Sequence, residues 1–328
     1  MEVREYLKLL YSQLPFDKVV EAENDIFYEF INKKIEVFVN AINQIDAESL
    51  QEILKSEFQV EHFVGSCTKL RFMNCMKKIC KDWLGILTLC YKGNLMDANI
   101  LMKKVLHSRC YSKYLVENYI EYFSFNLERR EYYRMRDNKI KDEEGNEIKV
   151  ENCWHVPYDK RMFASIGRYN LWGYPCLYLG NCKETCDAEL GELKEDERRW
   201  VGTFSLKKSI LLYDLRIPTS GMIEKAEKYD LFRMLLTYPI IALCSSRSNG
   251  KGFNEEYFIP QLLFHQILIA GNKETSHKGI IYSSTQNEGG YNIVLPALYD
   301  GIQPLTSGYS KVLLDMLEQQ SVEIYRTN

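Results

Sequence analysis

The chain of 328 residues is long enough for two domains, and its content of 46% hydrophobic and 27% charged residues is that of a folded protein rather than a disordered one. With 42 Lys and Arg against 45 Asp and Glu, the formal charge is −3, so no overall positive field attracts nucleic acid or an anionic membrane. No apolar run reaches the ~18 residues of a membrane span, and the first residues lack the basic and then apolar pattern of a secretory signal. We therefore expect a cytoplasmic protein without a membrane or nucleic-acid partner.

The ten cysteines indicate reduced thiols rather than zinc ligands. None of their spacings gives a Cys-x-x-Cys pair, and Cys90 and Cys244 lie within apolar stretches. Such residues act as small core side chains in a reducing compartment. No group of His, Cys and carboxylate residues has metal-ligand spacing, so no metal site is expected and His155 and His265 are interpreted as structural.

From residue 1 to about residue 127 the pattern is helical. Residues 21–43 place apolar side chains at spacings of three and four, which predicts a long amphipathic helix. Asp46, just before Ala47, has the position of a helix cap. Further helices are expected at residues 68–92, 96–110 and 113–126.

Charge is uneven within this half. Residues 1–61 hold six Lys or Arg and 13 Asp or Glu, whereas residues 69–113 hold ten Lys or Arg and two Asp. The simplest interpretation is that acidic and basic helices face each other or are solvated, and a surface for a partner is the alternative. His62 and His107 do not follow an Arg at the spacing of four to six residues that a helical ribonuclease site would need, so that site is not visible.

After residue 127 the pattern changes to short strands and helices. Residues 137–150 are polar and predict a hairpin or loop that turns at Gly145 and Asn146, whereas residues 321–328 give no usable signal. Strands are expected at residues 176–179, 200–206, 209–213, 279–283 and 292–295, and helices at residues 184–193, 221–236, 255–270 and 309–320. The sequence therefore predicts an α+β protein with an all-α domain of residues 1–127 and a mixed α/β domain of residues 128–328.

The second half contains four motif segments in a fixed order. The longest includes GRYNLWGYPCLYLG at residues 167–180 and TCDAEL at residues 185–190. The others are YYRMR at residues 132–136, GIIYSS at residues 279–284 and NIVL at residues 292–295. Together these segments resemble the RES-domain family over roughly residues 130–300.

The resemblance implies a fold related to the ADP-ribosyltransferases and cleavage of the nicotinamide–ribose bond of NAD⁺. The enzyme would then be an NAD⁺ glycohydrolase or phosphorylase, with NAD⁺ as its substrate and no separate cofactor. Characterised relatives usually act as toxins that an antitoxin neutralises, so we expect a toxin or defence effector that arrests growth through NAD⁺ depletion, with an antitoxin or inhibitor protein as a partner. The helical half is expected to control the toxin or to mediate assembly into a homo-oligomer.

The resemblance also assigns residues. Glu189, Arg134 and Ser284 match the family's catalytic Glu, Arg and Ser, although Arg136 competes with Arg134 for the first Arg position and Ser283 competes with Ser284. The positions expected to bind substrate are Arg168, Tyr178, Tyr169, Arg136, Ser283 and Asn292.

These residue types suit the chemistry. Positive charge develops on the ribose as the bond to nicotinamide breaks, and a carboxylate such as Glu189 stabilises it. The guanidinium groups of Arg134 and Arg168 can bind pyrophosphate oxygens in a bidentate manner. The cationic nicotinamide ring can lie on the face of Tyr178, and the hydroxyl of Ser284 can orient the ring or the ribose.

Two other functions stay open at this stage. The same Arg, Tyr and Glu residues would serve transfer of ADP-ribose to a protein or small acceptor, because the entering nucleophile decides the product. A non-catalytic nucleotide sensor is the alternative outside enzymes. Glu189 argues against a sensor, because binding alone does not need a carboxylate beneath the ribose.

Overall fold

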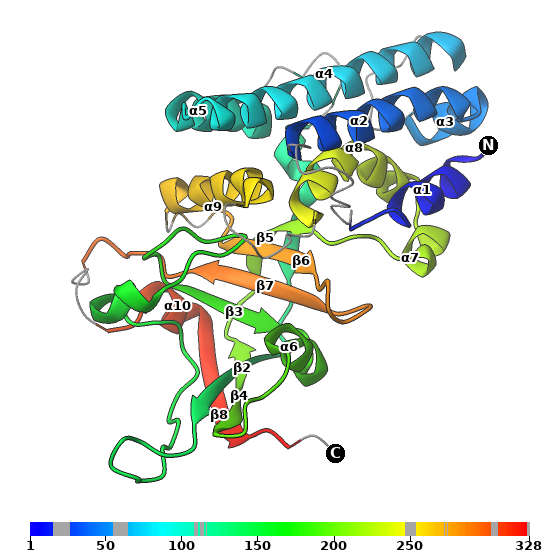
Figure 1. Cartoon of the computed structure of the whole chain (residues 1–328). Helices are drawn as coiled ribbons and strands as arrows, with labels where there is room; N and C mark the ends of the chain where they lie inside the picture. The colour runs from blue at the N-terminus through cyan, green and yellow to red at the C-terminus, as the bar shows by residue number, and fades with distance from the viewer. Residues whose placement is uncertain are drawn as a thin grey trace. The chain divides into compact units, whose positions relative to one another are not determined.

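The computed structural model describes residues 1–15, 27–54, 65–107, 111, 115, 117–246, 254–271, 273, 275–302 and 308–326. The chain divides into two compact units (Figure 1): Met1–Ser124 with Ile217–Gln266, and Phe125–Arg216 with Ile267–Asn328. The first boundary lies three residues before the expected one at residue 127. Residues 217–266 differ from the expectation, because they group with the N-terminal helices and not with the second half.

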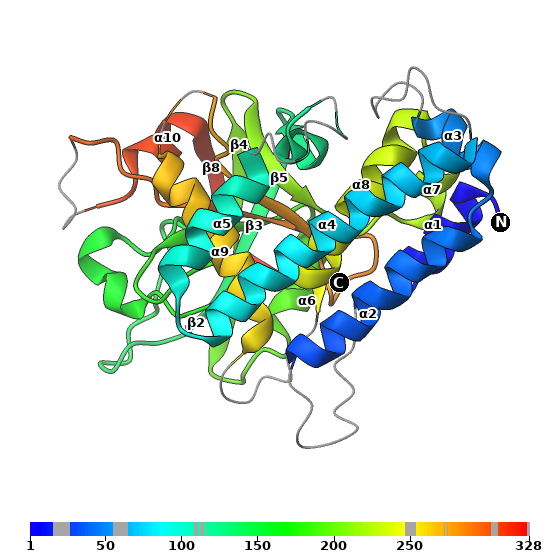
Figure 2. The ribbon, with the colours of Figure 1, turned by 90° about the horizontal axis from the view of Figure 1, so that it is seen from above.

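The described part of the first unit is built of helices around an aromatic core. Its longer helices are α1 (Val3–Tyr11), α2 (Phe27–Ala41), α3 (Ala47–Leu54), α4 (Gly65–Tyr91), α5 (Leu95–His107), α7 (Ser220–Lys225) and α8 (Lys228–Ser245). Helix α2 lies alongside α4 (Figure 2), and the fully buried rings include Trp83, Tyr119 and Tyr238. The expected cap of α3 is present, because the backbone N–H of Ser49 donates to Asp46 Oδ2 at 2.8 Å.

The helix expected at residues 113–126 is wrong in its described part. Tyr119–Phe123 forms a short 3₁₀ helix, and Ser124–Leu127 is strand β1. Four of the five residues in the 3₁₀ helix are buried, so the segment has no polar face of the kind an amphipathic helix needs. Some predicted positions lie outside the described residues. They are residues 113, 114 and 116 of this helix, residues 21–26 and 108–110 of other expected helices, and His62.

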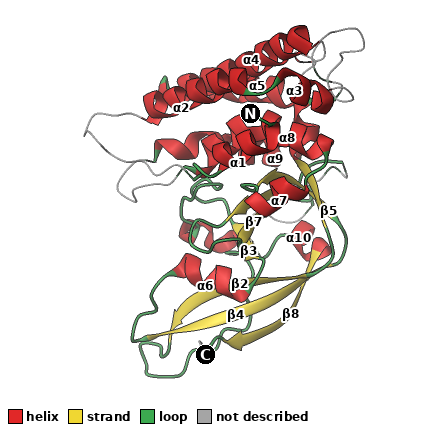
Figure 3. Cartoon of the chain, turned by 90° about the vertical axis from the view of Figure 1, so that its right-hand side faces the viewer, coloured by secondary structure: helices red, strands yellow, loops and turns green. Residues whose placement is uncertain are grey.

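The second unit contains a mixed, eight-stranded sheet in the order β1-β5-β6-β7-β3-β2-β4-β8. Its other strands are β2 (Glu131–Lys139), β3 (Cys176–Gly180), β4 (Glu197–Leu206), β5 (Ile210–Leu215), β6 (Gly279–Ser283), β7 (Tyr291–Pro296) and β8 (Leu317–Ile324). Strands β2, β4 and β8 run side by side (Figure 3), and β5 pairs with β6 in parallel. A core that includes Leu177, Phe204 and Ile293 packs within this unit. Helices α6 (Lys183–Leu190) and α10 (Lys311–Met316) complete it, and α9 (Phe258–Ala270) crosses the boundary between the units.

The α+β class is confirmed, and all five expected strands are present. The helix expected at residues 309–320 is wrong in its last part, because the chain is extended from Leu317 onward and pairs with β4. Most side chains of β8 are at least partly exposed, so its sequence lacks the apolar alternation by which a half-buried strand is recognised. The expected helix at residues 221–236 is interrupted at Ala226, whose backbone is extended. No helix among the described residues is long and apolar enough to cross a membrane.

Candidate functional site

The carboxylate of Glu189 is held by two side chains from other elements. Glu189 lies near the C-terminal end of α6, which packs on β2 and β3. The hydroxyl of Ser284, just after β6, donates to Glu189 Oε1 at 2.6 Å, and the amide of Asn292 on β7 donates to the same oxygen at 2.7 Å. None of the described residues donates to the second oxygen, Oε2. The cluster Glu189–Ser284–Asn292 therefore fixes one carboxylate oxygen and leaves the other available to a ligand.

A tight turn after β6 orients the Ser284 hydroxyl. Its Oγ accepts the backbone N–H groups of Gln286 and Asn287 at 3.1 and 3.0 Å. Because both lone pairs of the hydroxyl are then engaged, its hydrogen points to Glu189. Ser283 is the last residue of β6 and lies opposite Tyr291 in the sheet. Of the two candidate serines, Ser284 is the one whose hydroxyl donates to Glu189.

The start of α6 holds this turn in place. Thr185 is fully buried, and its hydroxyl donates to Asn181 Oδ1 at 2.9 Å and accepts from Asn287 Nδ2 at 2.8 Å. A Cβ atom on Gly290 would lie 2.4 Å from Thr185 Oγ1, so the close approach of loop and helix requires glycine there. The two segments that bring Ser284 and Glu189 together are thus tied to each other directly.

Tyr178 is positioned by the turn that contains Arg168. Gly167 and Asn170 exchange backbone hydrogen bonds at 3.1 and 3.4 Å across this turn. The hydroxyl of Tyr178 donates to Asn170 Oδ1 at 2.6 Å, while Asn170 Nδ2 donates to the carbonyl of Ser165 at 2.6 Å. Burial raises the pKa of Tyr178 well above its usual value, so the phenol is neutral. The half-buried ring of Tyr178 on β3 is therefore tied by a hydrogen bond to the turn that carries the half-buried side chain of Arg168.

The sheet places Tyr178 beside the Glu189 cluster. Gly180 lies opposite Asn292 in the pairing of β3 with β7. Residues two apart on a strand project to the same face, so Tyr178 and Gly180 share the face on which Asn292 lies. Tyr169, by contrast, is 1% exposed and its ring lies 4.6 Å from that of Tyr282. This position favours a packing role for Tyr169 over contact with a ligand.

Arg134 reaches across from β2 to β3. The two strands are in register at a single pair, Tyr133 with Gly180, and Arg134 Nη1 donates to the carbonyl of Cys176 at 3.3 Å. Burial lowers the pKa of Arg134, and the nearby positive charge of Arg136 lowers it further. Because Arg134 follows Tyr133, which lies opposite Gly180, Arg134 projects at this pair to the face opposite Asn292 and reaches β3 through its bond to the Cys176 carbonyl.

Arg134 and Arg136 both line a pocket of about 620 Å³. Because the two residues are two apart on β2, they project to the same face of the strand. The side chain of Arg136 is exposed, whereas that of Arg134 is partly buried. The other lining residues are Asp137, Asn138, Lys149, Val150, Glu151, Asn152, Trp154, His155, Val156, Pro157, Lys160, Phe163 and Tyr309.

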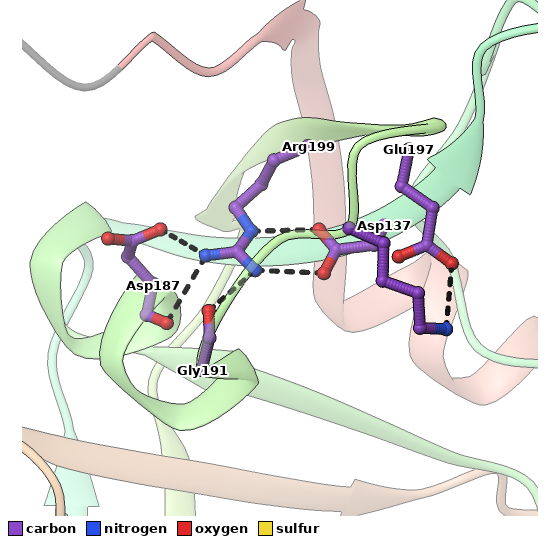
Figure 4. A network of polar contacts seen from close by, with 6 residues as sticks. Asp137, Asp187, Gly191, Glu197 and Arg199 are labelled. Atoms are coloured by element: carbon purple, nitrogen blue, oxygen red, sulfur yellow. Dashed lines mark hydrogen bonds and ion pairs between the residues drawn. The ribbon is translucent and has the colours of Figure 1, made fainter.

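A buried arginine, not expected from the sequence, anchors the end of α6 (Figure 4). Arg199 on β4 is 5% exposed and binds Asp137 on β2 with two hydrogen bonds of 2.7 and 2.8 Å. It also pairs with the carboxylate of Asp187 and donates to the carbonyl of Gly191 at 3.0 Å. Asp187 and Gly191 lie on either side of Glu189 in the sequence, so Arg199 fixes the segment that carries the candidate catalytic carboxylate.

Two other titratable side chains, His155 and Cys186, are buried and have structural roles. His155 is 1% exposed, its Nε2 accepts the backbone N–H of Ser310 at 3.0 Å, and burial lowers its pKa to about 4. Burial raises the pKa of Cys186 to about 12, so this thiol is protonated at neutral pH. In the part of the chain that the structure describes, no group of three or more His, Cys, Asp or Glu residues is placed to hold a metal ion.

Comparison with known proteins gives one informative relative. The chain is 25% identical over 168 residues to a Bacillus subtilis (strain 168) protein named "Putative toxin YopC". The match covers 47% of this chain and 36% of that protein, so the chain spans about a third of the relative's length. No family model and no solved structure match the chain. The resemblance to the RES-domain family therefore stays a prediction from the four motif segments.

Proposed function

We propose that the chain cleaves the nicotinamide–ribose bond of NAD⁺. The observation that carries the proposal is the carboxylate of Glu189, with one oxygen held by Ser284 and Asn292 and the other available to a ligand. As the bond from C1′ to the nicotinamide nitrogen breaks, its electron pair goes to the nitrogen and positive charge develops on the ribose. Glu189 stabilises that charge, water adds its oxygen to C1′, and the products are nicotinamide, ADP-ribose and one proton.

The neighbouring side chains bind the rest of the substrate in this proposal. Arg134 and Arg168 hold the pyrophosphate, since guanidinium groups bind phosphate oxygens through paired N–H donors. The ring of Tyr178 holds the cationic nicotinamide. Its hydroxyl is bonded to Asn170, so the orientation of the ring is set before the substrate enters. Asn292 and Ser284 keep Glu189 in place and do not attack the substrate.

We further propose that the activity makes the chain a toxin, because loss of NAD⁺ would arrest growth. The name of the Bacillus subtilis relative supports a toxin role. An antitoxin or inhibitor protein would then be the natural partner. The helical unit, which is a compact body of its own, is the part we assign to regulation or to assembly of a homo-oligomer.

The decisive experiment incubates the purified full chain with NAD⁺ and identifies the products. Free ADP-ribose indicates hydrolysis, a phosphorylated product in the presence of inorganic phosphate indicates phosphorolysis, and a modified protein indicates ADP-ribosyl transfer. The variant Glu189→Gln removes the charge and keeps the size, so the rate should fall by roughly 10²–10³. Glu192→Gln, a nearby exposed carboxylate outside the cluster, is the matched control and should keep the parent rate. Binding of NAD⁺ with no product would overturn the proposal and favour a sensor.

In cells, induction should lower total NAD⁺ and NADH while ribosomal RNA stays intact. Arg134→Ala should restore growth at an equal protein level, because a lost pyrophosphate contact weakens substrate binding by about 1.5–3 kcal/mol. Growth arrest with a steady nucleotide pool would contradict NAD⁺ depletion as the cause. Fragmented RNA would instead indicate a nuclease.

A further inference from the structure

The pocket beside Arg134 carries more positive charge than an NAD⁺ pyrophosphate requires. Four cationic side chains line it: Arg134, Arg136, Lys149 and Lys160. Among the described residues, no carboxylate forms an ion pair with Arg136, Lys149 or Lys160. The pocket also contains two acidic residues, Asp137 and Glu151.

One of the two acidic residues is already neutralised. Both carboxylate oxygens of Asp137 accept hydrogen bonds from Arg199, at 2.7 and 2.8 Å. Glu151 is therefore the single carboxylate left to offset four cations in the pocket lining. Such a concentration of positive charge in a concave site attracts a ligand with several negative charges.

The aromatic lining favours a ligand with a planar base. Trp154, Phe163 and Tyr309 line the same pocket. The side chain of Phe163 is 71% exposed, which places a large apolar ring in water when no ligand is bound. Stacking of a nucleobase on such a ring is favourable and does not depend on which base it is. Aromatic rings beside clustered cations together suit a nucleotide better than a simple anion.

We infer that this pocket binds the adenosine half of the dinucleotide and that its surplus cations select a substrate with a phosphate on the 2′-oxygen, so that NADP⁺ is preferred over NAD⁺. The inference rests on the proposed function and names its substrate class. Arg134 lines the pocket and donates to the carbonyl of Cys176 on β3, two residues before Tyr178, so one bound dinucleotide can extend from the aromatic side chains of the pocket past Arg134 toward β3. Arg134 and Arg168 meet the two charges of the pyrophosphate, and Arg136, Lys149 and Lys160 remain for the 2′-phosphate, which cationic side chains commonly bind in NADP⁺ sites.

The test compares two probes that differ in one phosphate. Titration calorimetry of the full chain with 2′,5′-ADP and with 5′-AMP isolates the 2′-phosphate, and initial rates give kcat/KM for NADP⁺ and NAD⁺. We expect 2′,5′-ADP to bind roughly tenfold tighter or more, because each charge-assisted contact contributes about a factor of ten. Equal affinity for the two probes would overturn the inference.

The variants Lys149→Ala and Lys160→Ala should each lower the ratio of kcat/KM for NADP⁺ over NAD⁺ by roughly tenfold. Lys141→Ala is the matched control, since Lys141 is an exposed lysine of the neighbouring hairpin that does not line the pocket. An unchanged ratio in both pocket variants would refute the assignment of these lysines.

The experiments distinguish failure of the proposed cleavage activity from failure of the proposed preference for a 2′-phosphate. If NAD⁺ is cleaved and the two probes bind equally, the proposed function stands and the preference for a 2′-phosphate is wrong. If 2′,5′-ADP binds more tightly through Lys149 and Lys160 but neither dinucleotide is cleaved, the pocket assignment stands and the proposed activity is wrong.

Discussion

Replacement of Arg199 by methionine tests whether the end of α6 must be held for the site to work. Arg199 bonds Asp137, the carboxylate and carbonyl of Asp187, and the carbonyl of Gly191 (Figure 4). Met keeps much of the side-chain volume but supplies no donor. The variant leaves two carboxylates and two helix-end carbonyls without their common partner.

The expected loss in the free energy of unfolding follows from the burial of the three charged side chains. Removal of one partner of a buried ion pair costs about 3–5 kcal/mol, because the other charge stays behind uncompensated. The side chains of Asp137 and Asp187 are 18% and 29% exposed, so water can partly solvate them after the change. We therefore expect a loss of about 3 kcal/mol in the free energy of unfolding, the lower end of that range.

The enzymatic rate per folded molecule should also fall, which distinguishes a role of Arg199 in positioning Glu189 from a role in stability alone. Glu189 lies between Asp187 and Gly191, so release of this segment displaces its carboxylate. A displacement of about 1 Å in a catalytic group can cost roughly 10²-fold in rate. Measured per folded molecule, well below the unfolding transition, kcat should fall because the Glu189 carboxylate is displaced. Arg199→Lys, which keeps the charge but not the fork of donors, should recover part of both losses.

Arg198→Met is the matched control for this experiment. Arg198 is the neighbouring residue on β4, and its partner Glu147 is 57% exposed. Exposed ion pairs contribute about 0–1 kcal/mol, so this variant should be close to the parent in stability and kcat. If Arg199→Met were as stable and as active as Arg198→Met, the anchoring role of Arg199 would be refuted.

Three further outcomes follow from the same geometry. Asn292→Ala removes one of the two donors to Glu189 Oε1, and steady-state kinetics should show kcat lower by roughly tenfold per folded molecule. Gly167→Ala places a Cβ atom 2.5 Å from Asn170 Oδ1, and urea unfolding should show a loss of about 1–3 kcal/mol; an unchanged midpoint would contradict the close approach. The pKa of His155 falls from 6.5 to about 4 on folding, so the unfolded chain binds the extra proton first, and stability should fall by up to about 3 kcal/mol as the pH is lowered from 6.5 to 4. His155→Gln should flatten that dependence in unfolding curves measured across this pH range.

The sequence predicted those elements in which one local pattern dominates. The strands β3, β6 and β7 are short apolar runs with buried residues on both faces, so their composition was sufficient to predict them. Strand β2 has an irregular burial pattern and several charged residues, and β8 is mostly polar and exposed. Their extended conformation depends on pairing with β4, which is an interaction between segments far apart in the chain.

The candidate site likewise has residues that the motif segments predicted and residues that only the tertiary structure identifies. The motif segments predicted Glu189, Ser284 and Asn292, which the structure brings into direct contact. Asn170 was part of the motif, but its contact with Tyr178 could not be inferred, because the turn that joins them is a tertiary feature. Arg199 carried no signal, because an arginine in a charged strand is usually a surface residue, whereas pairing with β2 and contacts with the end of α6 bury this one.

The two ambiguous residue pairs show what strand geometry adds to a motif. Ser283 and Ser284 are adjacent, and the chain leaves β6 between them, so one serine stays in the sheet and the other enters the turn that faces Glu189. Arg134 and Arg136 are two apart, and a strand places such residues on the same face. Unlike the two serines, both arginines therefore line one pocket, and the structure does not exclude either of them. Their depths differ, since Arg134 is partly buried and Arg136 is exposed. A desolvated guanidinium such as that of Arg134 suits the pyrophosphate, which lies near the bond that breaks. The exposed guanidinium of Arg136 suits a charge farther along the substrate. In the function proposed here, the two arginines therefore bind different phosphates of one ligand.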